Sequence, residues 1–173
     1  MALLASLSVS LSMCFVLGLI IPFGFFGIIV SPAFSSFLLL LITGVFLTII
    51  FVIIAFYISL MNENRIKGFG LGILIWLYFA VLYDALFLGL IIAFQDYPIE
   101  GMTILLTLLN PIDMARVLVL LKLEISSLMG YTGAVFNDYF GTTKGMIIAV
   151  ASFVVWMGIP FWGFIQKVKN KDF

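Results

Sequence analysis

Apolar residues form four long runs along the chain; two short polar stretches and one longer mixed segment separate them. The runs cover about residues 5–30, 34–60, 68–94 and 146–165. The first acidic or basic residue of the chain is Glu63, after two of these runs have ended. A helix needs about 20 predominantly apolar residues to cross a bilayer, so each run is long enough for one span. The pattern predicts an all-α integral membrane protein with four transmembrane helices in a single transmembrane domain.

Between the third and fourth runs, the segment 95–144 mixes polar and apolar residues. Near its centre is the sequence NPIDMAR, which begins at Asn110. A proline keeps the residue before it out of the α conformation, so a helix through 101–109 is expected to end at Asn110. Asn is a favoured N-cap and proline a favoured first helical residue, so a second helix is expected from Pro111. Asp113 would then lie in its first turn, where the helix dipole favours a carboxylate.

The two helices of this segment are short. Over 101–109 and 111–124 they would be about 14 and 21 Å long at 1.5 Å per residue, and neither crosses a hydrocarbon core of about 30 Å. The segment therefore predicts a broken helical hairpin before the last span. Asn110, Pro111 and Asp113 are its break and cap, and capping is their expected main role; whether Asp113 and Arg116 do more than start the helix stays open at this point.

Basic residues are concentrated in two places and give an orientation. One is the hinge 61-MNENRIKG-68, and the other is the tail 166-QKVKNKDF-173. Cytoplasmic loops carry an excess of Lys and Arg, and two spans separate these stretches, so both are expected to be cytoplasmic. The chain termini are then cytoplasmic and 95–144 is extracytoplasmic. A further span through 101–121 would put the basic stretches on opposite sides, which argues against it. The hinge residues expected at the cytoplasmic surface are Glu63, Arg65 and Lys67.

Asp84 is the one acidic or basic residue of the third run and lies near its middle. An ionised Asp in the centre of a bilayer costs about 2.5–3.5 kcal/mol on insertion scales, so it usually faces the bundle interior and has a partner. Two interpretations stay open: a residue that lines a translocation pathway or couples to transport, or a side chain that is buried and hydrogen-bonded for structural reasons. If the hairpin dips inward, Arg116 is the expected partner of Asp84.

Composition excludes several classes of protein. The 173 residues are 65% hydrophobic and 9% charged, with zero net charge and eight basic residues, too few for a nucleic-acid surface. There is no histidine and one cysteine, which excludes His-ligated metal sites, Ser-His-Asp triads and an intrachain disulfide. We expect no catalysis, no cofactor and no bound metal. Met13 and Cys14 are interpreted as packing residues rather than copper ligands.

The runs WLYFAVLYDALFLGLII at 76–92 and LLNPIDMARVLVL at 108–120, followed by a Gly-rich stretch and a last span with a basic tail, are similar to ABC-2 type permeases. Within these the chain most resembles the NosY-like permeases of nitrous oxide reductase maturation. Those permeases carry a similar Tyr-Asp run and the motif NP-x-D-x-x-R, which here ends at Arg116. The run SLSVSLSMCFVLGL near the start adds to the resemblance.

The resemblance implies a transport subunit of the inner membrane that forms a homodimer, is driven by a separate cytosolic ABC ATPase and is linked to a periplasmic partner protein. Copper or a sulfur species is the cargo usually proposed for that family. The family has six spans, so the resemblance implies that the first two, and the loop between them that docks the ATPase, are missing from the four-span sequence. Three interpretations stay open: a truncated gene product, a gene model begun at an internal Met, or a minimal relative of the family. The alternative from another class is a four-helix membrane scaffold without transport activity.

Overall fold

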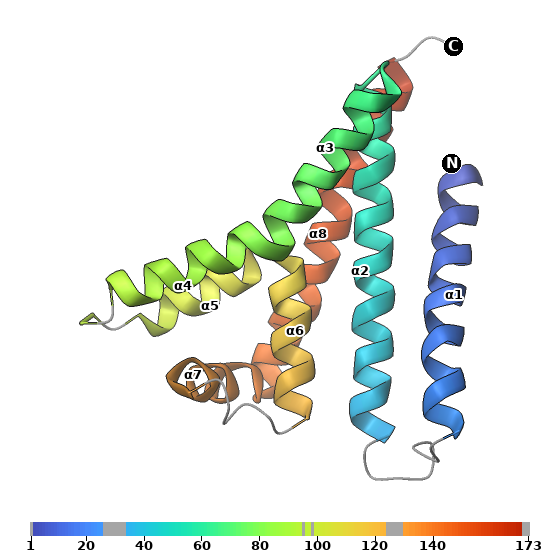
Figure 1. Ribbon diagram of the computed structural model, residues 1–173. Coiled ribbons are helices and arrows are strands. Elements are labelled where there is room, and N and C mark those ends of the chain that lie inside the picture. The colour runs from blue at the N-terminus through green and yellow to red at the C-terminus, as the bar shows by residue number, and fades with distance from the viewer. Residues whose placement is uncertain (1, 26–33, 95, 98, 124–129, 171–173) are drawn as a thin grey trace. The chain divides into compact units, whose positions relative to one another are not determined.

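The computed structural model describes residues 2–25, 34–94, 96–97, 99–123 and 130–170 (Figure 1). These residues form helices and connecting turns and include no strand. The helices are α1 (Ala2–Phe25), α2 (Phe34–Met61), α3 (Arg65–Leu77), the π-helical turn η2 (Tyr78–Leu82), α4 (Tyr83–Ala93), α5 (Glu100–Leu108), α6 (Pro111–Lys122), α7 (Gly130–Phe140) and α8 (Thr143–Asn170).

Four candidate membrane spans confirm the predicted all-α membrane protein. They are Ala2–Phe23, Phe34–Met61, Arg65–Ala93 and Thr143–Lys169. The third is made of α3, η2 and α4, which continue one another. Residues 26–30 of the first predicted span lie outside the described residues, and the last span is longer than predicted at both ends.

The polar hinge between the second and third spans is shorter than predicted. α2 ends at Met61 and α3 begins at Arg65, so the hinge is residues 62–64 rather than 61–68. The side-chain oxygen of Asn64 accepts a hydrogen bond of 2.9 Å from the Ile66 amide, which is the geometry of an N-cap. This cap starts the helix early, and Arg65 and Lys67 are therefore exposed residues of the first helical turns.

The chain divides into two compact units, Met1–Phe69 with Val154–Phe173 and Gly70–Phe153. In the first unit, α1 and α2 lie side by side (Figure 1). Small residues permit this contact, because the hydroxyl oxygens of Ser8 and Ser12 are buried and the Phe15 ring lies directly over Gly44. A side chain at Gly44 would collide with that ring.

Only part of α1 is covered within the described chain. Met13 is 59% exposed and Cys14 is also exposed, so the prediction that both pack in a core is wrong. The reason is that neither side chain is turned toward the contact with α2. Elsewhere in this unit Phe164 of α8 is buried against α2, with its ring edge-on to Phe56 at a centroid distance of 6.2 Å.

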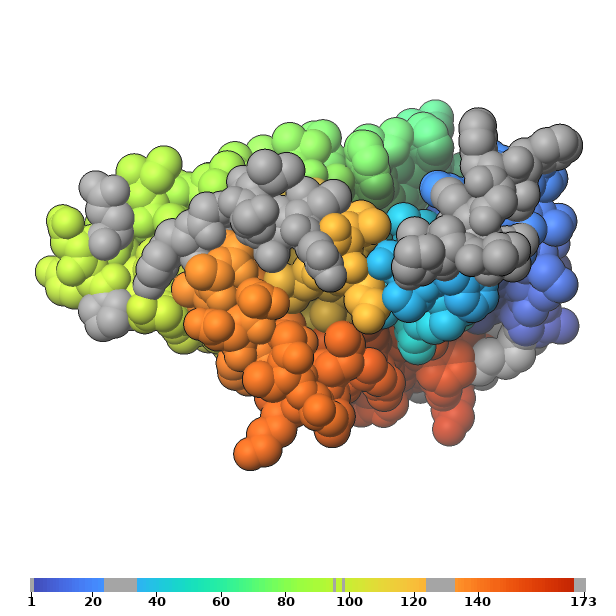
Figure 2. Space-filling model, turned by 90° about the horizontal axis from the view of Figure 1, so that it is seen from below, coloured from blue at the N-terminus to red at the C-terminus, as the bar shows by residue number. Residues whose placement is uncertain are grey.

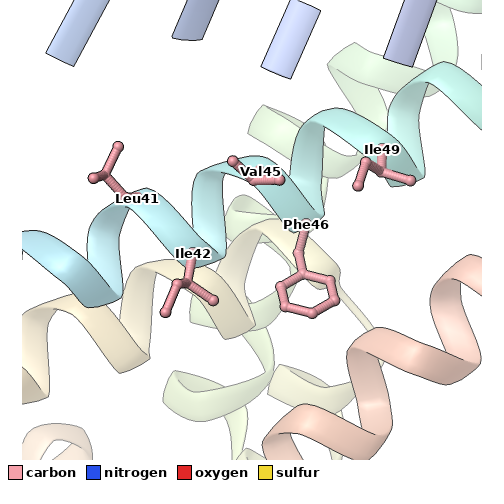
Figure 3. A pocket seen from close by; sticks show the side chains of 5 residues that line it. All are labelled: Leu41, Ile42, Val45, Phe46 and Ile49. Carbon is pink, nitrogen blue, oxygen red and sulfur yellow. The ribbon is translucent and has the colours of Figure 1, made fainter. Parts of the chain in front are cut away.

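α2 also carries a shallow hollow of about 250 Å³ (Figure 3). Its lining consists of Leu41, Ile42, Val45, Phe46 and Ile49. All five side chains are hydrocarbon, so the hollow offers no group that could orient a polar ligand.

The second unit contains the broken hairpin. α5 and α6 are bent by 115° at the break, which confirms the predicted helix–break–helix. α7 packs against α6 (Figure 2, where α7 is orange and α6 is amber). The Gly-, Asn- and Thr-rich composition of 130–145 gave no indication of this helix. Its fully buried side chains are Phe136 and Phe140, four residues apart and therefore on one helix face.

A tight turn joins α7 to α8. The Gly141 amide donates to the carbonyl of Asn137 at 3.0 Å, and the Thr142 hydroxyl donates to that of Tyr139 at 2.7 Å. The Thr142 hydroxyl oxygen also accepts from the Gly145 amide at 3.1 Å and caps α8. This cap starts the last span at Thr143 instead of the predicted 146.

Gly145 is required by this turn, since a Cβ there would collide with the backbone carbonyl of Tyr139. We expect Gly145→Ala to lower the free energy of unfolding by about 1–3 kcal/mol, the usual cost of overpacking. Gly72→Ala is the matched control, because nothing lies within 4 Å of its Cβ position. In a helix interior that change is expected to stabilise by up to about 1 kcal/mol. Unfolding in mixed micelles measures both, and equal effects would contradict the prediction.

Candidate functional site

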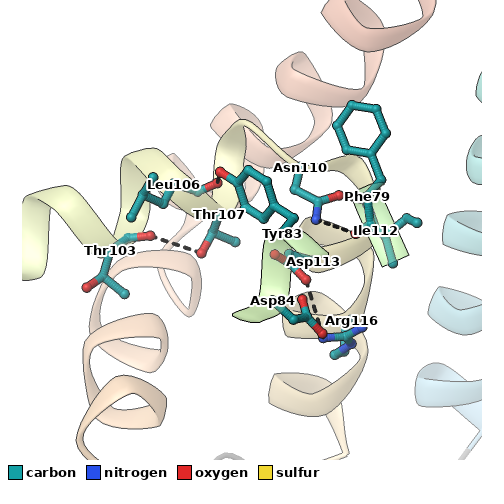
Figure 4. Close-up of polar contacts among 10 residues, drawn as sticks. All are labelled: Phe79, Tyr83, Asp84, Thr103, Leu106, Thr107, Asn110, Ile112, Asp113 and Arg116. Atoms are coloured by element: carbon teal, nitrogen blue, oxygen red, sulfur yellow. Dashed lines mark hydrogen bonds and ion pairs between the residues drawn. The ribbon is translucent and has the colours of Figure 1, made fainter. Parts of the chain in front are cut away.

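The helix break is held by the side chain of Asn110, which is fully buried. Its oxygen accepts a hydrogen bond of 3.0 Å from the Ile112 amide, so the predicted N-cap of α6 is confirmed, with Pro111 as the first helical residue. Its amide group donates to the carbonyl oxygen of Phe79 at 2.9 Å (Figure 4). Asn110 therefore caps one helix and fastens it to the membrane span at the same time.

The span that Asn110 contacts is locally widened. Tyr78–Leu82 form a π-helical turn, and the Tyr83 amide donates to the carbonyl of Tyr78 across it. Such a turn inserts one extra residue and so changes the direction of the side chains that follow, which is why π-turns are frequent at functional sites. The Tyr83 hydroxyl donates to the carbonyl of Leu106 on α5 at 2.7 Å. The span is thus bonded to both sides of the break.

The residue after Tyr83 is Asp84, and it meets the hairpin through Arg116. Nη1 of Arg116 is 2.6 Å from Oδ2 of Asp84, as expected for the predicted ion pair (Figure 4). The same nitrogen is 3.3 Å from Oδ1 of Asp113. One guanidinium thus joins two carboxylates, one from α4 and one from its own helix.

The three charged side chains differ in burial. The side chain of Asp113 is 10% exposed, whereas those of Asp84 and Arg116 are 33% and 45% exposed. Charges removed from water must be paired, because desolvation costs several kcal/mol for each ion. With both carboxylates ionised, the cluster would have one negative charge in excess. Two carboxylates that share a site resist simultaneous ionisation. The second carboxylate must therefore either keep its proton or have a further cation beside it.

A cavity of about 170 Å³ opens beside the cluster. Its charged and polar lining is formed by the three charged residues and Thr107, whose hydroxyl donates to the carbonyl of Thr103 at 3.0 Å. The remaining lining residues are apolar: Phe87, Leu88, Ile91, Val117 and Phe136. The cavity combines a charged end with hydrocarbon walls, which is typical of a site for a small ligand.

The predicted site residues fall into two groups. Asp84, Asn110, Pro111, Asp113 and Arg116 come together at the helix break of the second unit. The hinge residues Glu63, Arg65 and Lys67 belong to the first unit and are exposed. Sequence reasoning missed Phe79, Tyr83, Thr107 and Phe136. The available signal was slight: Tyr83 precedes Asp84, and Phe136 has Phe140 one helical turn away.

Among the described residues, no three of His, Cys, Asp and Glu gather at one place that could hold a metal ion. Comparison of the chain with protein families, with curated proteins and with solved structures found no match.

Two substitutions separate the roles of Asn110. Asn110→Ser keeps an oxygen that can cap α6 but is too short to reach Phe79, whereas Asn110→Ala loses both contacts. We expect both to destabilise the protein, and Ala to lower the free energy of unfolding by about 1 kcal/mol more than Ser. Unfolding in mixed micelles measures this difference. Equal losses would mean that the cap contributes nothing.

The shared guanidinium predicts unequal effects of charge removal. Arg116→Gln leaves two carboxylates without their cation, whereas Asp84→Asn leaves Arg116 beside Asp113. Arg116→Gln should therefore lower the unfolding free energy more than Asp84→Asn. In the double variant the second change should cost less than it does alone, with a coupling energy of about 0.5–3 kcal/mol. The same unfolding assay tests this, and additive losses would rule out the coupling.

Proposed function

We propose that this chain is the membrane-spanning permease subunit of an ABC-2 type transporter. The observation that carries the proposal is the Asp84–Arg116–Asp113 cluster, in which a charged residue of a membrane span is paired with a broken helical hairpin next to a cavity. Ionisable residues within membrane spans are costly and usually belong to ligand or ion pathways. The sequence resemblance to NosY-like permeases rests on the same residues.

The proposal assigns roles to the parts described above. Asp84 and Arg116 would line or couple the pathway, and Asn110 and Pro111 would fix the hairpin against the span. As a permease the chain would form a homodimer in the inner membrane with cytoplasmic termini. A separate ABC ATPase would hydrolyse ATP, a periplasmic protein would be a further partner, and support of nitrous oxide reductase copper-site maturation is the process that the resemblance suggests.

The second candidate is a membrane scaffold that holds a partner complex without transport. The observation that favours it is the hydrocarbon lining of the α2 hollow, which suits an apolar partner helix. A scaffold has no need of an ATPase, and that requirement separates the two candidates.

Purification of the tagged chain from its own membranes in mild detergent tests the proposal. We expect the chain to co-purify with a subunit that carries the phosphate-binding motif GxxxxGK[ST]. The purified complex should then hydrolyse ATP. Arg65→Gln with Lys67→Gln at the exposed start of α3 should reduce the recovered ATPase. Lys167→Gln with Lys169→Gln removes the same charge from the last turns of α8 and should leave it unchanged. Recovery of the chain with no ATPase would favour the scaffold.

A further inference from the structure

The cavity beside the charged cluster is short of positive charge. Arg116 is the one cation among its described lining residues, and two carboxylates face it. Both carboxylates approach the same guanidinium nitrogen, at 2.6 and 3.3 Å. An anionic ligand would therefore find the guanidinium already engaged, and the second carboxylate needs a proton or a cation beside it.

Asp113 is the cavity-lining residue with a buried oxygen that accepts no hydrogen bond from the described residues. The residue is 7% exposed, and its Oδ1 atom has no hydrogen-bond partner among the described residues. The 3.3 Å contact with Arg116 supplies electrostatic attraction without the geometry of a hydrogen bond. Leaving a buried acceptor unsatisfied is costly, more so for a charged group. A positive charge in the adjacent cavity would offset the charge of this carboxylate without touching the buried oxygen itself.

The other walls of the cavity define the rest of the ligand. They are aliphatic and aromatic, with Phe87 and the fully buried Phe136 among them. Aromatic faces attract cations, so these rings are compatible with a charged head group as well as an apolar body. The volume is about 170 Å³. An apolar cavity of about 150 Å³ is large enough to bind benzene.

We propose that this cavity binds a small monovalent organic cation, with an ammonium group facing the Asp84 and Asp113 carboxylates and an apolar body about the size of one aromatic ring. Binding requires only the second unit's own residues and does not depend on an ATPase. That such a cation is also the transported substrate rests on the proposed function.

Titration of the full chain in uncharged maltoside micelles with benzylammonium, followed by calorimetry, tests the proposal. We expect saturable binding, and benzyl alcohol, which has the same ring without the charge, should bind at least about tenfold more weakly. Asp113→Asn should weaken benzylammonium binding by at least about tenfold. Asp138→Asn makes the same chemical change at an exposed position of α7 and should bind like the wild type. Non-specific partition of benzylammonium into the micelles is not saturable and is the same for all variants, so it is distinguished from binding to the cavity.

Three results would overturn the proposal: no saturable binding by the wild type, equal affinity for benzyl alcohol, or equal affinity of the Asp113→Asn and Asp138→Asn variants. Circular dichroism checks that each variant is folded. If Asp113→Asn does not fold, Asp84→Asn carries the same test at a more exposed carboxylate of the cluster. If the chain binds benzylammonium but no ATPase co-purifies with it, the proposed transport function is contradicted and the cation site is still supported.

Discussion

The arrangement of the second unit depends on the need to pair a charge that lies in a hydrocarbon-rich helix. Asp84 cannot be left alone in a membrane span, because a carboxylate removed from water without a partner is unstable. Its partner, Arg116, comes from a helix that starts 27 residues later in the chain, at Pro111. For that contact to form, the hairpin must lie against the span. The helix break and the π-helical turn are the local features that accompany it.

Asn110 connects these local features. A single amide side chain caps α6 through its oxygen and bonds the Phe79 carbonyl through its nitrogen. Tyr83 adds a bond to α5 on the other side of the break. Because these three contacts satisfy backbone groups at an irregular point, the break is a defined geometry rather than a loose loop. It also sets the position of Asp113, two residues after Pro111, against the cavity.

The cluster that results has a composition unusual for a purely structural ion pair. One guanidinium between two carboxylates leaves an excess of negative charge when both are ionised, and the more buried carboxylate has an oxygen without a hydrogen bond. A simple pair would have balanced the charge. The imbalance, together with the cavity of about 170 Å³ beside it, is the basis of the proposed cation site.

The sequence by itself determined the four spans, the break at Asn110–Pro111 and the Asn110 cap, because these follow from apolar length and from backbone rules that act over a few residues. The helix start at Arg65 was misjudged, since the cap at Asn64 outweighed the polar composition of the hinge. The Asp84–Arg116 pair was expected from the sequence, and Asp113 lies three residues before Arg116 in it. The bond from Asn110 to Phe79, the helix α7 and the cavity beside the cluster were decided only by tertiary structure. Each joins residues far apart in the chain or depends on burial, and local sequence rules do not contain that information.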